Sequence, residues 1–205
     1  MKFGRRALKK AKTRIDIINA VYRLTADVNF RNLKVKTIAE EADVTEMTFF
    51  NYFPKKEDIL RYMMGLWELD LLVLRHREPL TGEPAIRRVF RHTAKLVKQH
   101  PGLMVSFISY LVTKEIAPDA NEIEAADRRL LYPDIPEIYE TRIPSGNEMM
   151  MGHLSEIDPS MDRTRMMLHL ASCFYGDVLI AHTANLDLDW LYSGSLDLIF
   201  KTRQV

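Results

Sequence analysis

The 205-residue sequence has one cysteine, only eight glycines and no long apolar run. A single thiol, Cys173, cannot form an internal disulfide, and it excludes any zinc site that needs two thiolates. The longest apolar stretches, such as 71–74, are far shorter than the roughly 20 residues that cross a bilayer. No apolar segment follows the basic N-terminus. We therefore expect no signal peptide, no membrane contact and a cytoplasmic protein.

Motifs for catalysis are also missing. The sequence contains no HExxH, no GxSxG and no phosphate-binding loop, and it lacks the paired Glu-x-x-His spacing of di-iron bundles. His169 and Cys173 fall one helical turn apart and could ligate a metal or respond to oxidants, but such a pair more often fills a core. We expect no enzyme, no metal site and no cofactor.

Charge is distributed unevenly along the chain. Residues 1–56 hold 13 lysines and arginines against 6 acids, a net charge of +7, which leaves −6 for the remainder of a chain whose total is +1. A basic front on an acidic body favours a polyanion as the partner of the front alone. A solvated basic tail is the alternative that charge leaves open.

The hydrophobic pattern predicts an all-α fold. The chain shows no sustained period-two alternation and no Asn-Gly or Asp-Gly hairpin signal. Apolar residues recur at helical spacing instead, as in the stripe Ile17, Val21, Leu24 and Val28. We expect Asn29 to end the first helix in a left-handed conformation.

Further helices follow from the same pattern and from the positions of proline and glycine. We expect a short helix around residues 38–42, a third helix capped by Thr45, and a long helix over 56–77 ended by Pro79, Gly82 and Pro84. Other helices are expected at 85–99, 103–114, 120–131, 161–184 and 188–202, with loops and short helices over 133–159.

Residues 33–56 have the outline of a helix-turn-helix, which places a second helix in the major groove of DNA. Apolar Val44, Phe49 and Phe53 would face inward. Short polar side chains would face outward toward base edges, as direct readout requires.

The segment 36–57, KTIAEEADVTEMTFFNYFPKKE, closely resembles the DNA-binding signature of the TetR family of transcriptional regulators. The resemblance extends through the first helix and covers about residues 11–70. It implies a ligand-responsive regulator, usually a repressor, that binds a palindromic operator on double-stranded DNA as a homodimer. Its C-terminal part would bind a small-molecule effector.

Four positions depart from the family pattern. Asp43 stands where the turn usually has glycine, and Lys34 stands where a serine or threonine usually caps the second helix. Thr25 replaces a common aromatic residue. Met47, where the family often has glycine, places an apolar side chain on the recognition surface and could touch a thymine methyl group.

The resemblance and the outward face together predict the DNA contacts. These residues are Lys36, Thr37, Glu46, Met47, Thr48, Phe50, Asn51, Tyr52 and Lys56. A basic arm would add backbone or minor-groove contacts through Arg5, Arg6 and Lys9.

The body should provide the dimer interface and the ligand pocket. A heptad-like stripe on the last two helices predicts the interface residues Met167, Ala171, Phe174, Val178, Ala181, Leu191 and Leu198. Aromatic and methionine side chains predict a pocket for a mostly apolar ligand, lined by Phe90, Met104, Phe107, Tyr110, Met167, Phe174 and Tyr175. The same residues could instead form a filled core.

We therefore expect an N-terminal helix-turn-helix head at residues 1–56 and a helical effector-binding and dimerisation domain at 57–205. The predicted function is ligand-responsive regulation of transcription. The alternative is a helical small-molecule-binding or catalytic protein that has lost DNA binding.

Overall fold

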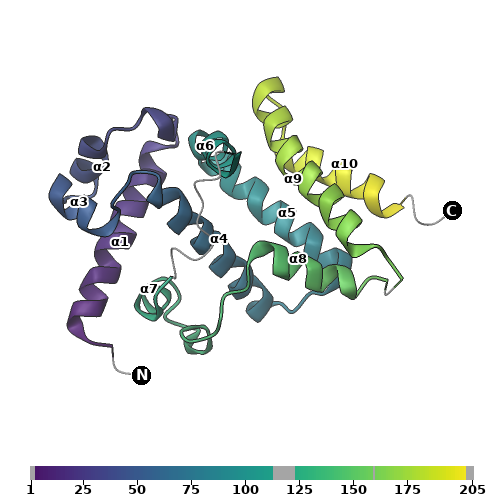
Figure 1. The fold of residues 1–205 in the computed structure, drawn as a ribbon, viewed down its shortest axis with the longest axis horizontal. Coiled ribbons are helices and arrows are strands. Elements are labelled where there is room, and N and C mark those ends of the chain that lie inside the picture. Colours follow the sequence, from purple (N-terminus) through teal and green to yellow (C-terminus); the bar gives the residue numbers. More distant parts are fainter. Residues whose placement is uncertain (1–2, 113–122, 159, 202–205) are drawn as a thin grey trace.

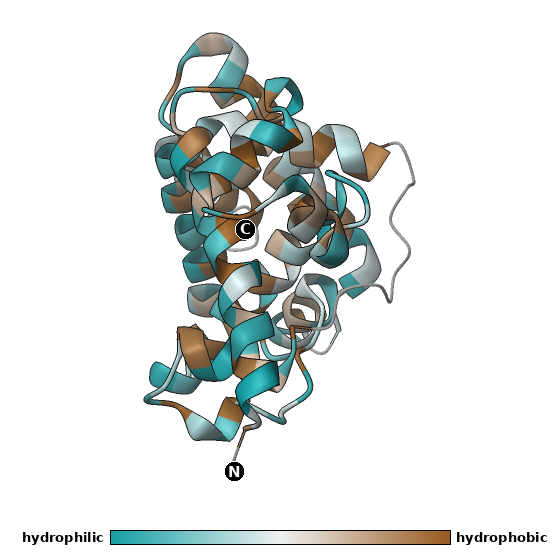
Figure 2. Ribbon diagram, turned by 90° about the vertical axis from the view of Figure 1, so that its left-hand side faces the viewer, coloured by the Kyte–Doolittle hydropathy of each residue, from teal (hydrophilic) through white to brown (hydrophobic). Residues whose placement is uncertain are grey.

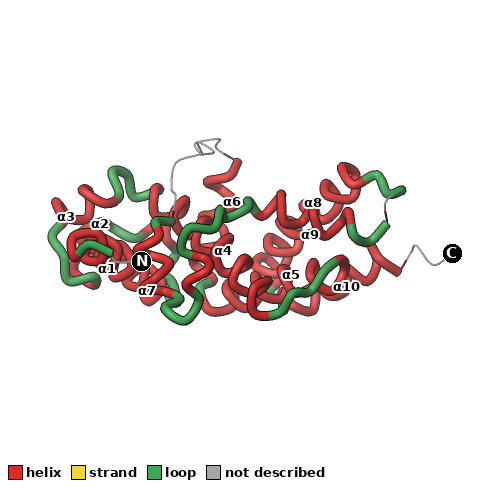
Figure 3. Tube along the Cα trace, turned by 90° about the horizontal axis from the view of Figure 1, so that it is seen from below, coloured by secondary structure: helices red, strands yellow, loops and turns green. Residues whose placement is uncertain are grey.

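The computed structural model describes residues 3–112, 123–158 and 160–201, and in these ranges every regular element is a helix. Seen from below, the molecule is an elongated assembly with the N-terminal head at one end and the last two helices toward the other (Figure 3). The predicted all-α class is confirmed.

The head contains α1 (Arg5–Leu24), the short 3-10 helix η1 (Phe30–Asn32), α2 (Val35–Glu41) and α3 (Glu46–Tyr52). Helix α1 ends earlier than its apolar stripe suggests. Asn29 is extended (φ −63°) rather than left-handed, and its side chain accepts from the Arg31 amide at 2.9 Å. The expected left-handed cap at Asn29 is therefore wrong, because Asn29 starts η1 instead of ending α1.

Helix α4 (Asp58–Arg77) runs from the head into the body (Figure 1). The body continues with these elements: α5 (Gly82–Gln99), α6 (Pro101–Val112), α7 (Ala125–Leu131), η2 (Pro136–Ile138), α8 (Gly146–Ser155), α9 (Arg163–Ala184) and α10 (Leu188–Lys201). Parts of the helices expected at 103–114 and 120–131 lie outside the described residues.

Buried apolar side chains form two clusters. The first, here called the head-side core, joins the three head helices to α4, α6, α7 and η2; its residues include Ile17, Val21, Phe30, Ile38, Phe49, Phe53, Ile59, Met63, Leu69, Leu103, Ile123 and Ile138. The second, the body core, includes Leu71, Ile86, Phe90, Met150, Leu154, Leu170, Val178, Tyr192 and Phe200. Apolar and polar segments alternate along the helices (Figure 2). The head-side core does not end at the predicted boundary after Lys56.

A buried ion network fastens α7 to α1. Arg14 donates to both carboxylate oxygens of Asp127 at 2.9–3.2 Å and to Glu124 at 2.8 Å, and the Asp127 side chain is 0% exposed. Lys10 adds a bridge to Glu124 at 3.0 Å. The pKa of Glu124 falls to about 2, because Arg14 hydrogen-bonds its carboxylate and Lys10 adds a second donor. Residues more than 100 positions apart are thus held together by charge.

Candidate DNA-binding face and ligand cavity

The turn between α2 and α3 is built by local backbone chemistry. Asp43 adopts the left-handed conformation (φ 53°) that its place in the signature requires, and the Val44 amide closes back on Ala39 at 2.9 Å. Thr45 caps α3 by accepting from the Thr48 amide at 3.0 Å. Lys34 provides no side-chain cap for α2. The left-handed Asp43, the Thr45 cap and the missing cap at Lys34 agree with the sequence pattern.

Helix α3 is anchored by two fully buried rings. Phe49 and Phe53 are 0% and 1% exposed, with ring centroids 5.9 Å apart. The opposite side of the helix is therefore turned outward. Four predicted contact residues are exposed there, namely Glu46, Met47, Phe50 and Asn51. Thr48 and Tyr52 are half-buried, and the Thr48 hydroxyl lies 2.9 Å from that of Thr45.

The basic residues predicted to contact DNA lie on two different helices of the head. Lys36 and Thr37 are exposed on α2. Arg5, Arg6 and Lys9 are exposed, but they belong to the first turns of α1 rather than to an extended arm. Phe3 is held by the Tyr139 ring at 5.8 Å and by the Arg129 guanidinium at 5.1 Å. The predicted arm is therefore a helical start packed against the body.

Lys56 has a structural role beside the predicted DNA contact. Its ammonium group donates to the carbonyls of Phe30, Arg31 and Leu33 at 3.3, 3.0 and 3.1 Å, and it lies 5.1 Å from the centre of the Phe30 ring. An ammonium has three N–H donors, so these carbonyls occupy all of them. Lys56 therefore holds η1 against the start of α4 in this structure, and its contact with DNA stays a prediction.

An apolar cavity of about 130 Å³ lies where α4, α5, α6 and α9 meet, next to the end of α1. Four of the predicted pocket residues line it: Met104, Phe107, Phe174 and Tyr175. Its volume is close to the roughly 150 Å³ of apolar cavities that bind benzene. The space expected between these helices therefore exists.

Three predicted pocket residues lie elsewhere. Phe90 is 1% exposed and does not line the cavity. Its ring centroid lies 5.2 Å from that of Phe174 and 4.8 Å from that of Tyr192. Tyr110 is buried in the head-side core, where its hydroxyl accepts from Arg61 at 3.2 Å. Met167 packs against the body core. Phe90 and Tyr110 are consequently core residues.

Sequence reasoning missed the walls that come from α1, α4 and α5. Trp67 is half-buried, its Nε1 donates to the Thr93 hydroxyl at 3.1 Å, and that hydroxyl donates to the Val89 carbonyl at 3.0 Å. The polar atoms of this wall thus satisfy one another. What remains for a ligand is an almost entirely apolar surface, completed by Tyr22, Met63, Met64, Leu96, Val97, His100, Leu103, Ile108 and Leu111.

The cavity lies on the seam between the two cores. Met63 and Leu103 belong to the head-side core and Phe107 packs against it. Trp67 and Met104 pack against the body core. A ligand in this space would touch both cores at once.

The elbow between α5 and α6, residues 100–102, joins the cavity to the end of α1. His100 lines the cavity, packs at a tilt of 37° against Tyr22 with ring centroids 4.4 Å apart, and donates Nδ1–H to the Tyr22 carbonyl at 3.0 Å. Burial lowers the pKa of His100, which keeps the ring neutral. A Cβ at Gly102 would lie 2.3 Å from the Val28 carbonyl oxygen, so only glycine permits this approach.

The predicted dimer stripe on α9 faces the wrong way. Val178 and Ala181 are buried in the body core, and Met167, Phe174 and Leu191 pack against it. Leu198 is 74% exposed. The exposed apolar residues of α9 are instead Leu168, Tyr175, Leu179 and Ile180, and Leu186 and Trp190, which follow α9 in the sequence, are exposed as well. The stripe from Met167 to Ala181 is therefore corrected to an intramolecular one.

Other chemistry has little support in the part of the chain that the structure describes. Burial and the carboxylate of Asp177 raise the pKa of Cys173, which disfavours the reactive thiolate, while His169 is exposed. No cluster of His, Cys, Asp and Glu in the described ranges could hold a metal ion. None of the described helices combines the length and apolarity needed to span a membrane.

A short helix, a tight turn and a second helix with an outward face form the helix-turn-helix geometry that places one helix in the major groove of DNA. Residues 17–63 match the family model of bacterial regulatory proteins, tetR family. No curated protein matches the sequence. The match covers the helix-turn-helix head and the start of α4.

Solved structures support that fold over almost the whole length. The chain is similar to the Thermus thermophilus FadR, a TetR-family transcriptional repressor in complex with lauroyl-CoA, at 19% identity and a TM-score of 0.55, covering 94% of this chain and 95% of that one. It is similar to the Bacillus subtilis regulator FadR in complex with stearoyl-CoA, at 18% identity and a TM-score of 0.55, covering 90% and 96%. The fatty acid degradation regulator FadR of Bacillus halodurans gives 17% identity and a TM-score of 0.55, covering 97% and 96%.

Proposed function

We propose that this protein is a transcriptional repressor that binds a palindromic operator as a homodimer and is released by a small apolar effector. One observation carries the proposal: an apolar cavity on the seam between the two cores is joined by a tight elbow to the helix that carries the DNA-binding head.

The DNA-binding face is α3 with the exposed start of α2. Asn51 suits a bidentate contact with adenine, and Lys36 is placed to neutralise a phosphate. The operator should read as an inverted repeat with half-site centres one helical turn, roughly 34 Å, or a small multiple apart.

The effector should be an apolar chain or ring. The cavity wall is mostly apolar, and the polar atoms of Trp67 and Thr93 bond each other. Two structures of similar fold hold acyl-CoA molecules, whose chains are apolar. Acyl chains of graded length are therefore the first probes, and flexible Met64 and Met104 would let the space expand.

Release would use the elbow as well as α4. A ligand that moves the elbow must move the end of α1, because His100 is bonded to Tyr22 and the Gly102 amide donates to the Thr25 carbonyl at 3.3 Å. A changed tilt of each head alters the spacing of the two recognition helices. The two recognition helices can then no longer bind both half-sites at the same time, and operator affinity falls.

The homodimer should form through the exposed apolar side of α9 and α10. Figure 1 shows these two helices side by side on the part of the body away from the head. Leu179→Glu should give a monomer in light scattering. Leu130→Glu, at a residue on α7 with similar exposure (41% against 43%), is the matched control and should stay dimeric.

DNA binding is tested by selecting sites from random duplex DNA with the full chain. We expect an enriched inverted repeat whose affinity falls steeply with salt. Asn51→Ala should weaken it by about 1–3 kcal/mol, whereas Asn19→Ala, on the exposed side of α1, should not. Failure to enrich any sequence, with ligand binding intact, would favour the alternative of a small-molecule-binding or catalytic protein that has lost DNA binding.

A further inference from the structure

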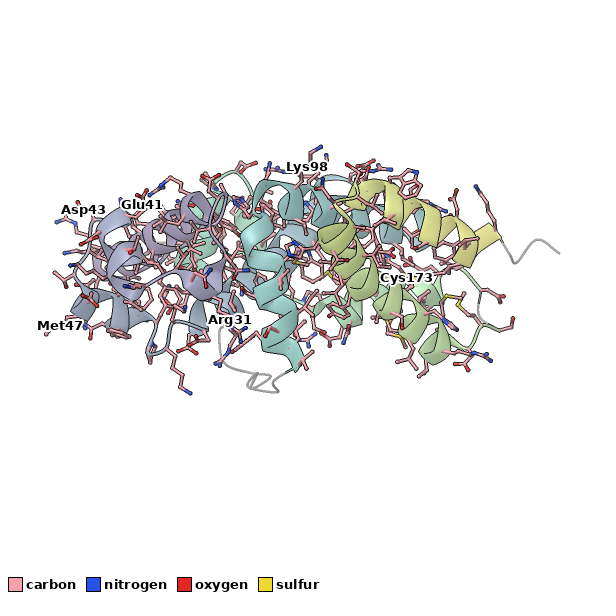
Figure 4. The ribbon with its side chains drawn as sticks, turned by 90° about the horizontal axis from the view of Figure 1, so that it is seen from above. Arg31, Glu41, Asp43, Met47, Lys98 and Cys173 are labelled. Carbon is pink, nitrogen blue, oxygen red and sulfur yellow. The ribbon has the colours of Figure 1, made fainter. Side chains whose placement is uncertain are left out.

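The recognition helix carries apolar side chains that are exposed among the described residues. Met47 is 76% exposed and Phe50 is 45% exposed, and they lie three residues apart on α3. Figure 4 shows Met47 at the outer end of the head, far from Cys173 on α9. This pair is therefore separate from the exposed apolar side of α9 and α10 that we assign to the dimer.

The two side chains differ in how firmly they are held. The Phe50 ring packs edge-on against the buried Phe49 ring, with centroids 5.4 Å apart, so part of its position is fixed before any partner arrives. Met47 is an unbranched thioether that adapts its shape to the surface it meets. Phe50 thus offers a contact surface that is partly fixed in advance, and Met47 offers one that can adjust its shape.

The major groove offers one main apolar group at base edges, the C5-methyl of thymine. The other groups presented there are hydrogen-bond donors and acceptors, which would lose water against Met47 without a partner. Asn51, four residues after Met47, suits adenine, the base that pairs with thymine. The chemistry of this helix face is therefore that of an A·T-containing site.

We propose that Met47, supported by Phe50, reads thymine by packing on its C5-methyl group in each operator half-site. The inference rests on the proposed function, since it needs the protein to bind operator DNA. It names the base that the recognition helix selects.

The test removes the methyl group alone. In the selected operator, each thymine is replaced in turn by deoxyuridine, symmetrically in both half-sites. Burying one methyl contributes about 0.8 kcal/mol. The substitution should therefore weaken binding about fourfold per contacted methyl, at one or two positions only.

Variants then assign the effect to Met47. Met47→Ala should weaken the thymine operator and make it equivalent to the deoxyuridine operator at the affected position. Met47→Leu keeps an apolar side chain and should keep the penalty. Because Met47 is exposed, all variants should retain the wild-type melting temperature.

Two results would overturn the inference while leaving the proposed function in place. They are an enriched operator that binds equally well with deoxyuridine at every position, and a penalty that persists unchanged in Met47→Ala. If selection enriches no DNA at all, the proposed function and this inference fall together.

Discussion

The two cores are closed by different chemistry. The head-side core is fastened by the buried pair Arg14–Asp127, whereas the body core is filled by the stacked and edge-on rings of Phe90, Phe174 and Tyr192. An ion pair fixes one geometry and fails sharply when a partner is lost, while packed rings allow small shifts. The cavity lies between them, where a ligand can change how one core sits on the other.

The largest effect should come from breaking the ion pair. Arg14→Ala leaves Asp127 buried and uncompensated, so the free energy of unfolding should fall by about 3–5 kcal/mol in urea titrations at neutral pH. Replacing both partners by apolar residues, as in Arg14→Met with Asp127→Leu, should recover much of that loss. A loss below about 1 kcal/mol for Arg14→Ala would show that the pair does not fasten this core.

Gly102→Ala should break the contact between the elbow and α1. The new Cβ would lie 2.3 Å from the Val28 carbonyl oxygen and 2.9 Å from that of Thr25, so backbone must move. We expect a loss of about 1–3 kcal/mol in unfolding free energy, together with weaker release of operator by effector. Gly152→Ala is the matched control, because its Cβ meets nothing within 4 Å. Unchanged release in Gly102→Ala would exclude the elbow as a route.

Substituting Lys56 should lower stability, whereas substituting Lys36 should weaken DNA binding. Lys56→Ala removes three hydrogen bonds to head carbonyls and should lower the unfolding free energy by about 1–3 kcal/mol. It should leave the salt dependence of operator binding unchanged. Lys36→Ala should do the opposite, reducing the slope of log affinity against log salt by about 1. A reversed pattern would assign the phosphate contact to Lys56.

The smallest effect concerns pH. Glu124 has its pKa lowered from 4.5 to about 2 in the folded protein, so it stabilises the fold above pH 4.5 and this contribution is lost as pH falls toward 2. Because its side chain is 41% exposed, the contribution should stay below about 1 kcal/mol. The difference between wild type and Glu124→Gln should therefore be full at neutral pH and vanish near pH 2. A difference that grows on acidification contradicts this assignment.

The head could be read from sequence because its signals are local. The left-handed Asp43, the Thr45 cap and the inward Phe49 and Phe53 each depend on neighbours within a few residues. The hydrogen bonds of Lys56 could not be predicted, because its carbonyl partners lie more than 20 residues away and leave no trace in a local pattern.

The contacts of the body were harder to predict from sequence, because α9 is apolar on two sides. One stripe, through Phe174 and Val178, packs inward, and the other, through Leu168 and Leu179, faces outward. Periodicity finds both stripes and cannot say which one is covered. The cavity walls Tyr22 and Trp67 were missed for a related reason: they meet only through contacts between distant helices.

The central claim is that ligand in the cavity and operator on the head oppose each other, and linkage tests it most directly. The ligand that most raises the melting temperature is titrated into the free protein and into its operator complex, followed by the tryptophan fluorescence of the unaltered protein, since Trp67 lines the cavity. We predict that operator weakens ligand binding by the same factor by which saturating ligand weakens operator binding. A ligand that changes the tryptophan fluorescence yet binds both forms with equal affinity would contradict the account.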